Sequence, residues 1–154
     1  MKAVELQRFS ADALTWVHSC QGVDWEALAA LYRVAPLGDK TPADLEAVFG
    51  SSRHTCFVYD GERLVAAGRV LADGRDCAYV CDVAVLPSHQ GLGIGRDVMA
   101  KLMELSKGHK KIILYAVPGK EEFYKKLGFK RMTTAMAIFQ DEAGAFARGL
   151  VSNG

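Results

Sequence analysis

A glycine-rich run between an apolar segment and an amphipathic one constrains the fold of this chain more than any other feature. The run reads Gln90-Gly91-Leu92-Gly93-Ile94-Gly95-Arg96. Residues 78–85 before it are almost continuously apolar, which suits a strand covered on both faces, and the residues after it place apolar side chains at helical spacing as far as residue 105. The order strand, glycine turn, helix predicts a fold in which helices pack on a sheet.

Helical and strand patterns alternate along the rest of the chain. Asp24 and Thr41 are cap residues at the starts of two helical patterns, and Gly128 follows the end of a third. These three helices are expected at residues 24–32, 41–49 and 120–127. Asp60-Gly61 joins two apolar runs as a hairpin. Strands are expected at residues 3–8, 55–59, 63–70, 78–85, 111–117, 129–132 and 135–139. The predicted class is therefore α/β with a mixed sheet.

The length and composition predict a single domain. The 154 residues show no repeat and no linker, so one domain over residues 1–154 is expected, with a tail at 141–154 that either adds a short helix or frays. With 19 basic and 18 acidic residues the net charge is +1, so neither nucleic acid nor a membrane is expected as a partner. A cytoplasmic location is expected because the N-terminus lacks the apolar region of a signal peptide.

The four cysteines predict neither a disulfide framework nor a metal site. They form no Cys-x-x-Cys pair. If Cys77 and Cys81 share a strand, they stand about 13 Å apart at roughly 3.3 Å per residue, too far for one metal ion. No metal is therefore expected, and the thiols are interpreted as free.

The glycine run has the composition of an anion site. Backbone N–H groups at the start of a helix favour a pyrophosphate, and Gly91, Gly93 and Gly95 remove side chains that would block its approach. The spacing is neither that of a dinucleotide-binding fingerprint nor that of a P-loop, which needs Gly-Lys-Ser/Thr. The alternative is a flexible turn that lets the helix pack closely on the sheet.

Three blocks together resemble the GCN5-related N-acetyltransferase (GNAT) family. The family's coenzyme A motif, Gln/Arg-x-x-Gly-x-Gly/Ala, is matched by residues 90–95, and the resemblance extends to Asp82-Val83-Ala84-Val85-Leu86-Pro87 and to residues 122–129, Glu-Phe-Tyr-Lys-Lys-Leu-Gly-Phe. It covers roughly residues 78–130. The resemblance implies a single-domain N-acetyltransferase with a mostly antiparallel mixed sheet, a parallel splayed strand pair and flanking helices.

The resemblance also implies where acetyl-CoA, the cosubstrate, binds. The backbone of the strand before the loop aligns the pantetheine arm and the acetyl group, and the loop holds the pyrophosphate, with the Arg96 side chain either adding charge or lying in solvent. The implied cofactor-binding residues are Val83, Ala84, Val85, Gln90, Gly91, Leu92, Gly93, Ile94, Gly95, Arg96, Phe123 and Lys126.

The resemblance implies one catalytic residue, Tyr124, and the pattern of the strand predicts a second, Asp82. Tyr124 matches the family's general acid, which reprotonates the departing thiolate; an aromatic pair on a helix is otherwise core packing. Asp82, a lone carboxylate in an apolar strand, suits a water-mediated base, with a structural carboxylate as the alternative. His89 is interpreted as a surface turn residue. A covalent route through Cys81 finds no paired base in the pattern.

The acceptor side carries no readable motif. In the family it is formed by the first two helices and the last strands, which correspond to residues 22–52 and 131–140. Similarity to small-amine acetylators favours a small primary amine such as an arylalkylamine or a polyamine. A protein lysine or N-terminal amine is the second possibility, and a non-catalytic acyl-CoA-binding module is the third. Family members are often dimers, so a homodimer stays open.

Overall fold

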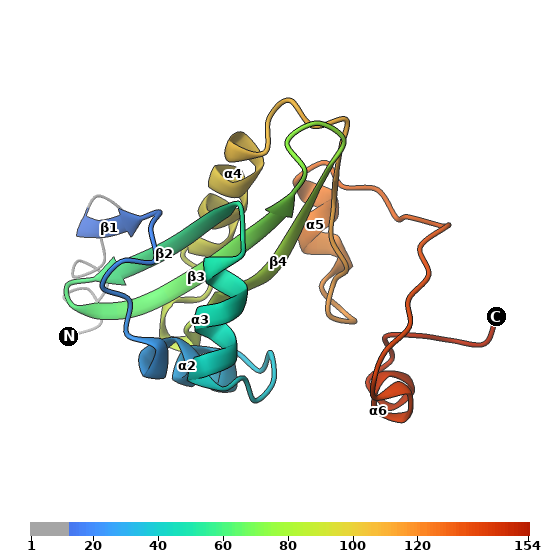
Figure 1. Ribbon diagram of the computed structural model, residues 1–154, viewed down its shortest axis with the longest axis horizontal. Helices are drawn as coiled ribbons and strands as arrows, with labels where there is room; N and C mark the ends of the chain where they lie inside the picture. Colours follow the sequence, from blue (N-terminus) through green and yellow to red (C-terminus); the bar gives the residue numbers. More distant parts are fainter. Residues whose placement is uncertain (1–12) are drawn as a thin grey trace. The chain divides into compact units, whose positions relative to one another are not determined.

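The computed structural model describes residues 13–154, which form two compact units that meet between Leu114 and Tyr115 in the sequence (Figure 1). The first unit holds the sheet and the glycine loop. The second holds two short helices joined by irregular chain. The strand expected at residues 3–8 lies outside the described residues.

Within the described residues, the sheet has five strands in the order β1-β2-β3-β4-β5. Every neighbouring pair is antiparallel except β4 and β5, which are parallel. The predicted mixed sheet with one parallel pair is thus confirmed. The strands are β1 (Leu14–Val17), β2 (His54–Asp60), β3 (Arg63–Ala72), β4 (Cys77–Val85) and β5 (Lys111–Ile113).

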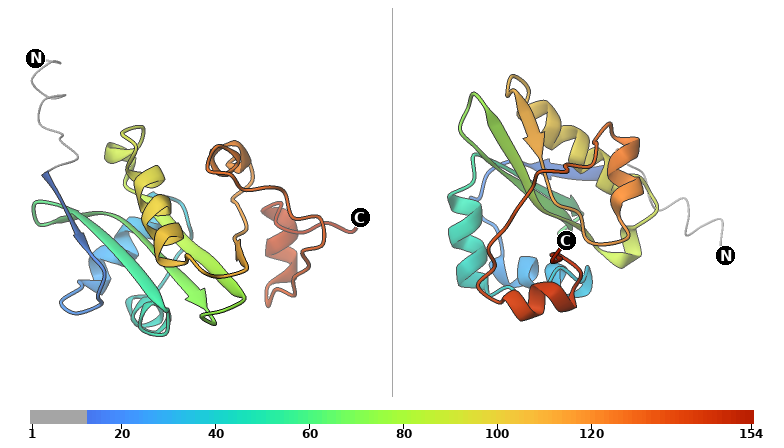
Figure 2. Two further views of the ribbon diagram at one scale, coloured as in Figure 1. Left: turned by 90° about the horizontal axis from the view of Figure 1, so that it is seen from above. Right: turned by 90° about the vertical axis from the view of Figure 1, so that its right-hand side faces the viewer.

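The helices of the first unit begin where the sequence supplies caps. α2 (Trp25–Val34) starts after Asp24, whose carboxylate accepts the N–H of the third helical residue, and α3 (Pro42–Gly50) starts after Thr41, whose hydroxyl does the same. α4 (Ile94–Leu105) follows the glycine loop. Figure 2 shows α3 and α4 on opposite faces of the sheet, with α2 on the side of α3. The sheet is therefore the middle of three layers.

Contacts on both faces of the sheet bury its central strands. Phe57 on β2 and Phe49 on α3 are fully or almost fully buried, with ring centroids 5.2 Å apart. On the opposite face, a side chain at Gly68 of β3 would come within 2.9 Å of Leu102 on α4 and within 3.1 Å of Val83 on β4. Gly68 thus lets α4 lie close to the sheet beside the strand that precedes the glycine loop.

The C-terminal part of the chain departs from the predicted strands. β5 ends at Ile113 and not at residue 117, and residues 129–132 and 135–139 form no strand. An apolar segment makes a strand only when a neighbouring backbone pairs with it, and the described residues supply no such partner here. Met136 and Ile138 accordingly have 97% and 103% of their surface exposed.

Two short helices of the second unit agree with the sequence. α5 (Glu121–Lys126) is followed by Gly128 with φ 100°, the left-handed conformation expected after a helix end. α6 (Glu142–Ala147) realises the short helix that was one alternative for the tail. Asp141 caps it by accepting the Gly144 N–H at 2.9 Å.

Candidate active site

The middle of β4 contains a bulge. Ala84 pairs with Ala67 and Cys81 pairs with Arg69, so that two residues of β4, Asp82 and Val83, stand opposite Gly68 alone. Asp82 has φ 56°, and among the described residues it is the one non-glycine residue with a positive φ. Such conformations are uncommon for residues other than glycine, and although aspartate adopts them more readily than most, they are kept in a strand where neighbours hold them. The bulge is therefore an imposed feature of this strand.

The same part of β4 extends beyond its pairing with β5. The parallel ladder joins Cys77–Tyr79 to Lys111–Ile113 and goes no further in the described chain. From Val80 to Val85 the outer edge of β4 has no strand beside it among residues 13–154. Backbone groups on a strand edge of this kind can bind an extended ligand. The expected parallel pair is confirmed, and its splaying stays a prediction.

The glycine loop combines left-handed backbone with a bare helix start. Gly91 has φ 78° and Gly93 has φ 85°, and Gly93 stands at the cap position of α4 without any side-chain hydrogen bond to the helix. The first N–H groups of a helix have no acceptor inside it, so those of α4 are free for an outside anion. No atom lies within 4 Å of a side-chain carbon built on Gly91, which leaves room for such a ligand.

Side chains around the loop divide into those that support it and those that are free. Ile94 is buried in the core and offers only its backbone, whereas Leu92 is exposed. The Gln90 amide donates to the Val85 carbonyl at 3.0 Å, which links the loop entry to the end of β4. The Arg96 side chain is 67% exposed, approaches Asp97 at 3.6 Å and lies over Gly93. These residues fit a pyrophosphate held mainly by backbone, with Arg96 free to add its charge.

His89 is buried, so its interpretation as a surface turn residue was wrong. It ends the short 3-10 helix Pro87–His89, and its Nε2 lies 2.9 Å from the Asp60 carboxylate while Nδ1 lies 2.7 Å from the Ser88 hydroxyl. Asp60 belongs to the β2–β3 hairpin. His89 therefore connects that hairpin to the start of the glycine loop.

The Asp82 carboxylate is engaged by two cations. Arg69 Nε donates to Oδ2 at 2.7 Å, and Lys40 Nζ lies 3.4 Å from Oδ1. The Asp82 carbonyl accepts a hydrogen bond of 2.6 Å from the Tyr32 hydroxyl. This geometry favours the structural alternative for Asp82, whose carboxylate is held by side chains. Its role as a base stays a prediction.

Tyr124 lies on α5, in the second unit, together with Phe123 and Lys126. Its ring makes edge contacts with Phe123 at 5.0 Å and with Phe129 at 6.1 Å between centroids. Burial raises the pKa of the Tyr124 hydroxyl above its ordinary 10, so that the group is protonated at neutral pH and able to donate. Phe123 and Lys126 are exposed on the same short helix. The remaining predicted residues all belong to the first unit.

The cysteines offer no nucleophile that is ready to react. Burial raises the pKa of the Cys81 thiol above its ordinary 9.0 and that of Cys56 to about 12, which disfavours the reactive thiolate. All four cysteines are free thiols, and residues 13–154 contain no cluster of metal-ligating side chains. Across the same residues, no helix is long and apolar enough to cross a membrane.

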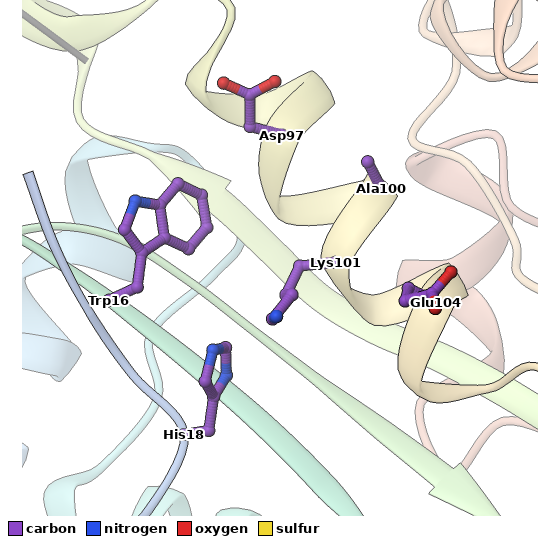
Figure 3. A pocket seen from close by; sticks show the side chains of 6 residues that line it. All are labelled: Trp16, His18, Asp97, Ala100, Lys101 and Glu104. Carbon is purple, nitrogen blue, oxygen red and sulfur yellow. The ribbon is translucent and has the colours of Figure 1, made fainter. Parts of the chain in front are cut away.

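An open hollow lies elsewhere, between β1 and α4. Trp16 and His18 line it from the edge of the sheet, facing four residues of the helix (Figure 3). None of the predicted site residues contributes to it. The helix residues that line it are Asp97, Ala100, Lys101 and Glu104.

Residues 23–129 match the model of the acetyltransferase (GNAT) family, which is more than half of the chain. The chain therefore belongs to this family. A GNAT family acetyltransferase from Streptococcus pneumoniae TIGR4 superposes with a TM-score of 0.69 at 25% identity, over 83% of this chain and 99% of that one.

Relatives of known name share a shorter segment. The chain is 49% identical over 69 residues to serotonin N-acetyltransferase 2, chloroplastic, of Oryza sativa subsp. japonica, a match that covers 44% of this chain and 34% of that protein. It is 41% identical over 67 residues to glucosamine 6-phosphate N-acetyltransferase of Trypanosoma brucei brucei, covering 42% and 46%. The chain thus spans less than half the length of either relative.

Sequence reasoning missed two parts of this site. The partners of Asp82 and the burial of His89 both depend on residues far away in the chain. Signals did exist: Asp82 and Arg69 are charged residues inside otherwise apolar strands, and such residues are buried mainly when they are paired. β1 was missed because its four residues show no alternation.

Proposed function

We propose that this chain is an acyltransferase that moves the acetyl group of acetyl-CoA directly to a primary amine of a small molecule. The observation that carries the proposal is the uncapped start of α4 behind Gly91 and Gly93, placed at the end of the bulged strand β4. A site of bare amides suits the pyrophosphate of a coenzyme, and the free edge of β4 suits its extended arm.

The chain's own groups supply the rest of the chemistry. In the transfer the amine nitrogen bonds to the acyl carbon, the carbon–sulfur bond breaks, and one proton passes from the nitrogen to the departing thiolate. Backbone N–H groups of β4 near Val83 are suited to stabilise negative charge on the carbonyl oxygen. Tyr124 would return a proton to sulfur, which its raised pKa permits over the whole neutral range.

A direct route is favoured over a covalent one. The thiol of Cys81 is kept protonated by burial, and its Sγ lies 3.5 Å from the Tyr79 carbonyl, which is not a base. The amine must lose its own proton before or during attack. Asp82, acting through water, stays the predicted acceptor of that proton.

The acceptor is proposed from the relatives. The rice relative is named for serotonin and the trypanosomal one for glucosamine 6-phosphate, both of which are small primary amines. A protein lysine or N-terminal amine is the second candidate.

A homodimer is a possible assembly, and neither nucleic acid nor a membrane is a proposed partner. Free cysteines suit the proposed cytoplasmic location, since such thiols persist in reducing compartments.

The proposal is tested by following thiol release from acetyl-CoA with a panel of amines. The panel contains 2-phenylethylamine, spermidine, glucosamine 6-phosphate and a lysine-containing peptide. Release with a small amine is expected. Release with the peptide alone would replace the small-molecule acceptor by a protein, and acetyl-CoA binding without any release would leave a binding module.

A substitution at Tyr124 tests whether this residue is the general acid. Tyr124→Phe should lower kcat by about ten-fold or more and leave acetyl-CoA affinity nearly unchanged, because it removes a proton donor that acts only during the reaction. Tyr59→Phe, on β2 of the first unit, is the control and should behave as the unmodified protein. Unchanged turnover in Tyr124→Phe would remove Tyr124 from the mechanism.

A further inference from the structure

Four side chains converge on the bulge of β4, and the proposed reaction does not use three of them. We name Tyr32, Lys40, Arg69 and Asp82 the bulge clasp. They come from α2, from the loop after it, from β3 and from the bulge itself. The clasp joins one covering layer of the first unit to the strand that carries the proposed transfer site.

Tyr32 holds the backbone of the bulge. It is fully buried on α2, and its hydroxyl donates to the Asp82 carbonyl at 2.6 Å, a short bond across 50 positions of the sequence. The ring packs 6.4 Å from that of Phe49 between centroids. Burial is the main reason why the pKa of Tyr32 is well above 10, so the hydroxyl is always a donor. At neutral pH it therefore holds the Asp82 carbonyl as a hydrogen-bond donor.

Arg69 holds the side chain of the bulge. Its Nε–Asp82 distance is 2.7 Å, and Nη1 donates to the Ser52 hydroxyl at 3.3 Å. The guanidinium also lies 6.0 Å from the centre of the Phe49 ring. Arg69 is thus fixed by α3 on one side and fixes Asp82 on the other. Planar, multiply bonded contacts of this kind restrict both partners more than a single lysine contact does.

Lys40 completes the clasp from the more exposed side. Its Nζ lies 3.4 Å from Asp82 Oδ1 and 5.7 Å from the centre of the Tyr32 ring. Every polar group of the Asp82 side chain and its carbonyl is therefore engaged. A strained residue persists when its surroundings determine it from several sides, and here three separate elements do so.

We propose that Tyr32 and Arg69 are positioning residues for acyl transfer, which hold the bulge at Asp82 and thereby set the backbone of Val83 beside the free edge of β4. The inference rests on the proposed function. Asp82 then serves as the anchor on which both residues act.

Two measurements test the proposal, one of them independent of activity. Tyr32→Phe keeps the buried ring and removes only the hydroxyl. It should speed amide hydrogen exchange at Val83 and Ala84 by about ten-fold, because local opening of the bulge becomes easier. Tyr59→Phe, on β2, is the matched control and should leave those amides unchanged. Unaltered exchange in Tyr32→Phe would overturn the clasp.

The kinetic measurement separates positioning from proton transfer. Tyr32→Phe should lower kcat about ten-fold, keep the KM for acetyl-CoA within about two-fold, and retain the pH profile of the unmodified protein. Arg69→Met should be as slow, Arg69→Lys should recover part of the rate, and Arg63→Met on the same strand should be neutral. Faster exchange with unchanged kcat would overturn the role in transfer. An unmodified protein that acetylates no amine would instead refute the proposed function, while exchange still decides whether the clasp holds the bulge.

Discussion

The two turns that flank β4 treat their backbone N–H groups in opposite ways. At its start, the Asp73 carboxylate accepts the N–H groups of Arg75 and Asp76 at 2.8 and 2.7 Å and that of Cys77 at 3.2 Å. At its end, the glycine loop leads into α4 with no carboxylate, hydroxyl or amide capping the helix. One turn carries its own anion and the other does not.

This difference separates a structural turn from a binding one. A carboxylate within a turn satisfies the local amides permanently, which fixes the hairpin. A loop of glycines offers these N–H groups no side-chain acceptor. Their hydrogen bonds then depend on a group from outside the loop. In the first unit, α2 and α3 start with a side-chain cap and α4 does not, whereas in the second unit α6 is capped and α5 is not. The bare start of α4 is consistent with the proposed coenzyme site.

A bulky residue in the glycine loop should have the largest effect on acetyl-CoA binding. Gly93→Val places a β-branched side chain where φ is 85° and should weaken acetyl-CoA binding by about 100-fold or more, because the loop can no longer present its amides. Calorimetry measures the loss. Gly108→Val, at φ 97° beyond the other end of α4, imposes similar strain and should leave affinity within about two-fold. Equal affinities for the two variants would refute the site.

An acidic residue in the glycine loop would give this second turn an anion of its own, as Asp73 does in the first turn. Gly91→Asp should bind acetyl-CoA about ten-fold more weakly than Gly91→Asn, since both residues tolerate the left-handed backbone at φ 78° and only the first adds negative charge. The gap between the two should narrow as salt is raised. If the charged and uncharged variants bind equally well at low salt, no anion is bound at this loop.

Arg96 should contribute less than the backbone. Its side chain is 67% exposed and already near Asp97, so Arg96→Gln should weaken acetyl-CoA binding by only about three-fold at low salt. Arg63→Gln on β3 is the control for loss of one positive charge. A loss as large as that of Gly93→Val would mean that the charge, and not the loop backbone, holds the ligand.

Local signals in the sequence account for the parts of the fold that were predicted well. Asp24 and Thr41 lie next to the helices that they cap, and Asp60-Gly61 lies within the hairpin that it turns. The glycine loop was recognised for the same reason: the strand, the turn and the helix are consecutive. Each of these predictions needs only neighbouring residues.

Features that depend on distant partners were predicted poorly. Residues 135–139 are a continuous apolar run and yet form no strand, because an apolar run alone does not supply a partner backbone. Leu14–Val17 carries little pattern and forms β1, because β2 pairs with it. The bulge clasp joins Tyr32 to Asp82 across 50 positions, so the sequence showed an isolated carboxylate and not what holds it.

The smallest expected effect concerns the first turn, where the anion is internal. The N–H groups of Arg75 and Asp76 lower the pKa of the Asp73 carboxyl from 3.8 to about 2. Because the folded value lies below the unfolded one, the ionised turn stabilises the fold fully above pH about 4, and this contribution is lost as the pH falls toward 2. Asp73→Asn should therefore lower the melting temperature slightly at pH 7 and by a shrinking margin below pH about 4. Asp39→Asn, an exposed aspartate in the loop after α2, is the control for the loss of one surface carboxylate. A margin that stayed constant down to pH 2 would show that the carboxylate charge is not what fixes the turn, and the contrast between the two ends of β4 would then rest on shape alone.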